Sequence, residues 1–143
     1  MSFHLLDDAP PADVGFVASG ATLEDCFRAA ADATLAVMLG NPEALHLRER
    51  RVLHVESDRA DLALLKLLEE LIYYKDADGL FLRVTQLSTV HDGGRWVVDA
   101  TAEGETIDPT RHQLSGDVKA VTMHRLRVEH TEDGWQATVV LDI

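Results

Sequence analysis

The residues best suited to chemistry stand near the two ends of the sequence. Asp142 is the penultimate residue, so its side chain lies beside the α-carboxylate of Ile143. Asp8 and Asp13 flank a segment with two prolines, which fix φ and stiffen the backbone. Carboxylate oxygens are the ligands that Ca²⁺, Mg²⁺ and Mn²⁺ prefer. If the two ends meet, they form a divalent-metal site; the alternative is that these acids are exposed and only keep the protein soluble.

The remaining candidates are isolated side chains. His112 lies in a polar segment, and His124 follows Lys119 by five residues, without the spacing of a known metal-binding motif. The sequence has no GxSxG, no P-loop and no GxGxxG, so nothing in it predicts an enzyme. A metal-dependent phosphoester hydrolase using the three aspartates is an alternative, but no general base accompanies them.

The positions of these residues depend on the elements around them. Apolar residues recur at helical spacing over 23–38, in a helix that Thr22 can cap with Glu24 and Asp25 in the first turn. A wide stripe of leucines over 62–72 predicts a second helix, which Ser57 or Asp58 can cap and which ends near Lys75. Alternating or apolar runs predict strands over 13–18, 51–55, 80–90, 95–102, within 118–131, and over 135–143. The last of these strands directs Leu141 and Ile143 to the core and Asp142 to the opposite face. We therefore predict one α+β domain over residues 1–143, with helices packed on one face of a mainly antiparallel sheet.

Composition narrows the function classes. The formal net charge is −12, and such a surface repels phosphate backbones, so strong direct nucleic-acid binding is not expected. A cation or a basic protein partner is the better expectation. The single cysteine excludes a disulfide framework, no apolar run is long enough to span a membrane, and the N-terminus lacks a secretory signal. These features favour a cytoplasmic protein.

Four ordered sequence blocks resemble the archease family, and together they cover essentially the whole chain. The blocks are Ala12-Asp13-Val14-Gly15-Phe16 with Gly20-x-Thr22-Leu23-Glu24; Gly104-Glu105-x-x-Asp108-Pro109-x-Arg111-His112; Val118-Lys119-Ala120-Val121-Thr122-x-His124; and Val140-Leu141-Asp142-Ile143.

The resemblance implies both a fold and a function. It implies a strand-helix-strand-strand core with an inserted region. It also implies a non-catalytic accessory protein of the GTP- and metal-dependent RNA ligase that joins 3′-phosphate or cyclic-phosphate ends to 5′-hydroxyl ends in tRNA splicing and RNA repair. Members of the family promote guanylylation of the ligase histidine and multiple turnover. By this resemblance Asp13 and Asp142 bind a metal, with the C-terminal carboxylate nearby, and Lys119 contacts the partner. We place His112 and His124, from the same blocks, in the partner-binding set.

The sequence departs from the family pattern before Asp13. The family usually reads Asp-His-Thr-Ala-Asp there, whereas this chain reads Asp8-Ala9-Pro10-Pro11-Ala12-Asp13. The usual histidine is absent and Asp8 stands one residue further back, so Asp13 is the stronger candidate ligand. Met123 stands where an aromatic residue is common. A protein-interaction module whose acids bind a metal is the main alternative function.

Overall fold

Seven strands and two α-helices make up the fold of this computed structural model, which describes residues 1–9 and 13–143. In chain order the elements are β1 (Ser2–Leu5), β2 (Asp13–Gly20), α1 (Leu23–Met38), the 3₁₀ turn η1 (Pro42–Ala44), β3 (Glu49–Ser57), α2 (Ala60–Asp78), β4 (Leu80–Asp92), β5 (Arg95–Thr106), β6 (Ala120–Thr131) and β7 (Gly134–Asp142). All strand pairs are antiparallel. The predicted α+β class is confirmed.

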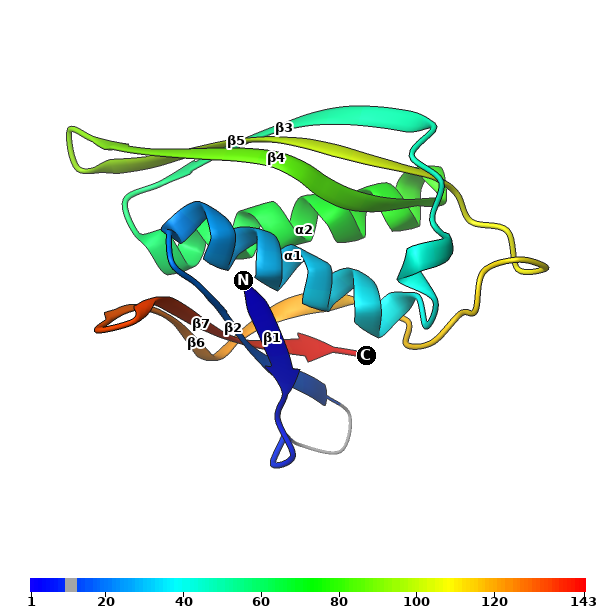
Figure 1. Cartoon of the computed structure of the whole chain (residues 1–143), viewed down its shortest axis with the longest axis horizontal. Coiled ribbons are helices and arrows are strands. Elements are labelled where there is room, and N and C mark those ends of the chain that lie inside the picture. Colours follow the sequence, from blue (N-terminus) through cyan, green and yellow to red (C-terminus); the bar gives the residue numbers. More distant parts are fainter. Residues whose placement is uncertain (10–12) are drawn as a thin grey trace.

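The strands form two sheets, which corrects the expectation of a single sheet. One sheet has the order β1-β2-β7-β6 and the other has the order β3-β5-β4. Figure 1 shows both helices lying in a layer between the two sheets, and both helices contact strands of each sheet. Each sheet is therefore covered by helices on one face. Hairpin spacing along a sequence cannot reveal this, because it does not say which hairpins share hydrogen bonds.

The chain order of the elements contains one motif nested inside another. β2, α1, β6 and β7 form a strand-helix-strand-strand unit, and the inserted β3, α2, β4 and β5 repeat the same order. In both units the last strand lies in the middle and pairs with the first strand on one side and with its hairpin partner on the other: β7 with β2 and β6, and β5 with β3 and β4. Both hairpins close on a stacked histidine–tryptophan pair, His91–Trp96 and His130–Trp135. The long connection after β5 then carries the chain from the inserted sheet back to the first sheet.

Local sequence explains where the helices begin and end. The Thr22 hydroxyl caps α1 by accepting a hydrogen bond from the Asp25 N–H at 3.1 Å. At the start of α2 the cap residue is Arg59, one or two residues later than the predicted cap at Ser57 or Asp58. That helix also continues past Lys75 to Asp78, because Gly79 adopts the left-handed conformation that terminates it.

The core fills the space between the sheets. α1 is buried on most of its circumference, and many of its buried residues are alanines, which allow close approach to both sheets. The largest fully buried side chains include Phe16 and Phe27, with Leu64, Leu67 and Leu68 of α2. The Cys26 thiol is also buried, which raises its pKa to about 11 and makes it unreactive. This rigid core sets the positions of the strand ends described next.

The stiffening assigned to Pro10 and Pro11 falls on residues outside the described part of the chain. Among the residues that are described, neither helix is long and apolar enough to cross a membrane.

Candidate functional site

The first and last long strands of the chain pair with each other, and this pairing brings the two predicted aspartates together. In the register of β2 and β7, Asp13 lies directly opposite Asp142. Both residues are half-buried, and both lie on the face opposite Val14 and Leu141, which pack on the core. Side chains directly opposite in an antiparallel pair have Cβ atoms about 5 Å apart. The prediction that the two ends meet is therefore confirmed; their role in metal binding stays a prediction.

Two further predicted residues border the Asp13–Asp142 pair. Ile143 follows directly and packs partly on the core, as its alternation predicted. The backbone N–H of Lys119 donates a hydrogen bond to the carbonyl of Asp142 at 2.8 Å, while the Lys119 side chain is exposed. This side chain lies in a shallow cleft with Tyr73 and Asp76 of α2. The backbone of Lys119 is thus held beside Asp142, while its side chain points toward α2, on the other face of the sheet, and is accessible to a partner.

Asp8 does not join the pair. Its carboxylate accepts from Arg125 at 3.1 Å, and this hydrogen bond and the arginine charge lower the pKa of Asp8. Arg125 lies in a large bulge of β6 and has a φ of 60°, which is uncommon for a residue with a side chain. The same bulge holds His124, which is exposed. The structure thus places Asp8 and His124 at the bulge, with Asp8 engaged in an ion pair.

The donor set decides which metals the pair could hold. Within residues 1–9 and 13–143, no group of three or more His, Cys, Asp or Glu side chains is close enough to hold a metal ion. Asp13 and Asp142 therefore supply two carboxylates of the oxygen type that hard divalent cations prefer. Two carboxylates with water or backbone oxygens fit Mg²⁺, Mn²⁺ or Ca²⁺, whereas the absence of a nearby thiol or imidazole among these residues disfavours zinc.

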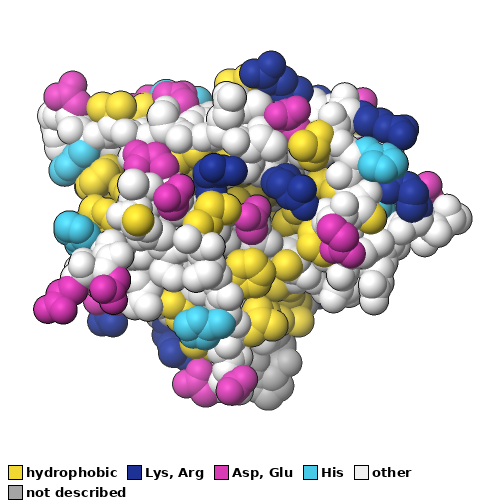
Figure 2. Space-filling model, viewed as in Figure 1, with side chains coloured by type: hydrophobic (Ala, Val, Ile, Leu, Met, Phe, Trp, Pro, Cys, Tyr) yellow, Lys and Arg dark blue, Asp and Glu magenta, His cyan; other side chains and the backbone are white. Residues whose placement is uncertain are grey.

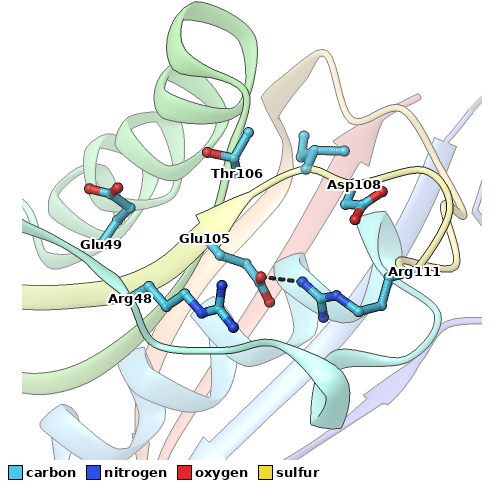
Figure 3. A pocket seen from close by; sticks show the side chains of 7 residues that line it. Arg48, Glu49, Glu105, Thr106, Asp108 and Arg111 are labelled. Atoms are coloured by element: carbon cyan, nitrogen blue, oxygen red, sulfur yellow. Dashed lines mark hydrogen bonds and ion pairs between the residues drawn. The ribbon is translucent and has the colours of Figure 1, made fainter.

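The connection between β5 and β6 contains Lys119, and the buried Glu105 binds residues at the start of this connection. Glu105 is 5% exposed and accepts from the His46 N–H at 2.5 Å. Arg111 donates to the same carboxylate, and Figure 3 shows Arg48 and Arg111 both extending toward it. Burial alone would raise the pKa of Glu105. The hydrogen bonds from the His46 N–H and Arg111, together with the nearby His112 ring, outweigh burial and lower that pKa to about 2.

His112 belongs to this buried cluster and not to the surface. Its Nδ1 accepts the Asp108 N–H at 2.8 Å, so the neutral ring carries its proton on Nε2, which lies 3.2 Å from Glu105. The Nε2–H is not well aligned for a hydrogen bond, and no other described group pairs with it. Because the His112 side chain is 0% exposed, the prediction that it contacts a partner does not fit its position. It holds the loop against Phe81 instead.

The rest of the connection is fixed by backbone bonds to the end of α1. The N–H of Gly40 donates to Gln113, and those of Ser115 and Gly116 donate to Met38 and Val37, all between 2.7 and 3.0 Å. The sequence places His112 in a polar segment, and no role was predicted for Glu105. The one signal available was the pairing of an acid with Arg111 and His112 at close spacing, which is also typical of a solvated loop.

The comparisons with known proteins agree with this geometry. A profile of the Archease protein family matches residues 3–143. The protein named archease from Pyrococcus furiosus is 33% identical over 92% of this chain and 93% of its own length, and that from Methanosarcina mazei is 35% identical over 92% and 90%.

Solved structures give the same result. The solution structure of protein 1598 from Methanobacterium thermoautotrophicum has a TM-score of 0.84 at 29% identity and covers 99% of this chain and 98% of that one. A crystal structure from Thermotoga maritima, described as an archease and possible chaperone, shares the fold with a TM-score of 0.62 at 18% identity, over 98% of each chain. The chain therefore belongs to the archease family.

Proposed function

We propose that this protein is a non-catalytic accessory factor of the RNA ligase that joins 3′-phosphate or cyclic-phosphate ends to 5′-hydroxyl ends. In this role it promotes guanylylation of the ligase and lets the ligase turn over repeatedly, using a divalent cation held at Asp13 and Asp142. Membership of the archease family supports the accessory role. The free, buried thiol of Cys26 is compatible with a reducing cytoplasmic setting.

The single observation that carries the proposal is the direct opposition of Asp13 and Asp142. Like charges directly opposite in a sheet are destabilising. Among the described residues, no lysine or arginine forms an ion pair with either aspartate. A bound divalent cation would supply the missing positive charge and a Lewis-acidic centre at this edge of the sheet.

The surface charge supports a basic protein as the partner. Figure 2 shows acidic side chains spread over the visible face, in keeping with the net charge of −12. A ligase that binds RNA presents a positive cleft, and opposite charge accelerates association with such a surface. We assign partner contact to the exposed side chain of Lys119, whose backbone N–H bonds the Asp142 carbonyl.

The test is ligase turnover in the presence and absence of this protein. The ligase is given GTP, Mn²⁺ and an RNA with 3′-phosphate and 5′-hydroxyl ends, and covalent guanylylation and joined RNA are both measured. We expect the wild type to raise turnover and D13N and D142N to abolish that effect. D92N, which removes one acid from the tip of the β4–β5 hairpin, is the matched control and should behave as wild type. Unchanged stimulation by D142N would contradict the proposal.

A separate assay addresses hydrolysis. The protein alone is incubated with phosphoesters and Mn²⁺. Hydrolysis that disappears in D13N and D142N would replace the accessory role with the hydrolase alternative.

A further inference from the structure

The charged side chain of Lys75, near the C-terminal end of α2, is largely shielded from water. The Lys75 side chain is only 8% exposed. A lysine ammonium is rarely buried unless other groups bind it, because losing its hydration is costly. Lys75 lies outside all four sequence blocks that carry the family resemblance.

The ammonium of Lys75 donates two hydrogen bonds and forms an ion pair with a third group. It donates to a carboxylate oxygen of Asp117 at 2.7 Å and to the carbonyl of Val118 at 2.8 Å, and it lies 2.8 Å from a carboxylate oxygen of Asp76. Burial opposes the charged form, but the bonds to Asp117 and Asp76 outweigh it, so the pKa of Lys75 is raised. The lysine is therefore charged at neutral pH, with two hydrogen bonds and two carboxylates around its ammonium.

Two of these acceptors belong to the segment that leads to the Asp13–Asp142 pair. Val118 is fully buried, and the next residue, Lys119, donates its N–H to the carbonyl of Asp142. We infer that Lys75 is a positioning residue: its ammonium holds Asp117 and Val118 and so fixes the backbone that presents Lys119 beside Asp142. The part of this inference that concerns the ligase rests on the proposed function.

Lys75 and Lys119 have different roles in this inference. Lys119 is exposed and has no carboxylate within ion-pair distance in the described part of the chain. The Lys75 side chain is only 8% exposed and its ammonium is bound to groups of this chain, so it acts through Lys119 and does not itself contact a partner.

The first test is hydrogen exchange of backbone amides and needs no ligase. In K75M the amide of Lys119 should exchange about ten-fold faster or more, the factor expected when a charge-assisted hydrogen bond is lost. K66M is the matched control, because Lys66 also lies on α2 and donates to a carbonyl, that of Glu56 at 2.7 Å, at the other end of the helix. D117N, at an exposed position, serves if K75M does not fold. Equal exchange at Lys119 in K75M, or D117N, and wild type overturns the inference.

The second test is a double-mutant cycle on ligase stimulation. We expect K119A and K75M each to lower stimulation about ten-fold, K75R to restore part of it, and K75M in the K119A background to cause no further loss. Additive losses, or full stimulation by K75M together with faster exchange at Lys119, would overturn the positioning role. If the wild type itself fails to stimulate the ligase, the proposed function fails, and the exchange experiment still decides whether Lys75 positions the segment.

Discussion

Replacing Asp13 by asparagine should change stability in opposite directions with and without a divalent cation. Asp13 and Asp142 are directly opposite and half-buried. Two like charges about 5 Å apart repel by about 0.8 kcal/mol in bulk water and by about 3 kcal/mol at an effective dielectric constant of 20. Because the pair is partly exposed, we take about 1 kcal/mol as the relief that D13N provides.

The assay is thermal unfolding in chelator and in excess Ca²⁺. In a domain of this size 1 kcal/mol corresponds to about 2–4 °C, so D13N should melt about 2–4 °C above wild type in chelator. At a Ca²⁺ concentration 100-fold above its Kd, the wild type gains about 2.7 kcal/mol, or about 5–10 °C. D13N should lose most of this gain, because one of its two side-chain ligands no longer carries a charge.

The matched control is D92N, which also removes one negative charge but at the far hairpin. It separates the local pair from the general relief of a net charge of −12. The reasoning is refuted if D13N melts at or below wild type in chelator, or if D13N retains the full Ca²⁺-dependent rise.

Three further predictions concern residues away from the pair. E105A should destabilise the fold by about 3 kcal/mol in urea unfolding, because it leaves the His46 N–H and Arg111 without their buried acceptor. Since the pKa of Glu105 falls from 4.5 to about 2 on folding, its contribution should be present above pH 4.5 and lost as the pH falls toward 2. A wild type that shows no steeper acid loss than E105A would contradict the assignment. The pKa of His54 is raised above 6.5 by its hydrogen bonds to Glu56 and Asp99. The stabilisation that His54 provides should therefore be complete below pH 6.5 and decline as the pH rises through the folded-state pKa. Unfolding curves of H54Q measured across this range should lack that decline. G104A should yield little folded protein by circular dichroism, because a Cβ at this strand position would overlap the carbonyl of Phe81, and a native melting curve would show that the two strands can separate locally.

The sequence by itself determined the elements and the faces of their side chains. The alternation from Trp135 to Ile143 correctly directed Leu141 to the core and Asp142 to the other face, because side chains in a strand alternate with a period of two. Thr22 and its acidic neighbours correctly marked the start of α1. The ordered blocks also identified the family, and with it the pair of aspartates.

Only the tertiary structure decided which of these elements meet. Local patterns do not encode strand pairing, so the division into two sheets and the direct register of Asp13 with Asp142 appear only in the fold. Burial also depends on neighbours distant in sequence. His112 reads as a polar loop residue but is enclosed with Glu105, and Lys75 reads as the last residue of a helix but is bonded to Asp117, 42 positions further along the chain. The physical reason is that a polar side chain can be buried only where the fold brings it partners, and those partners are long-range.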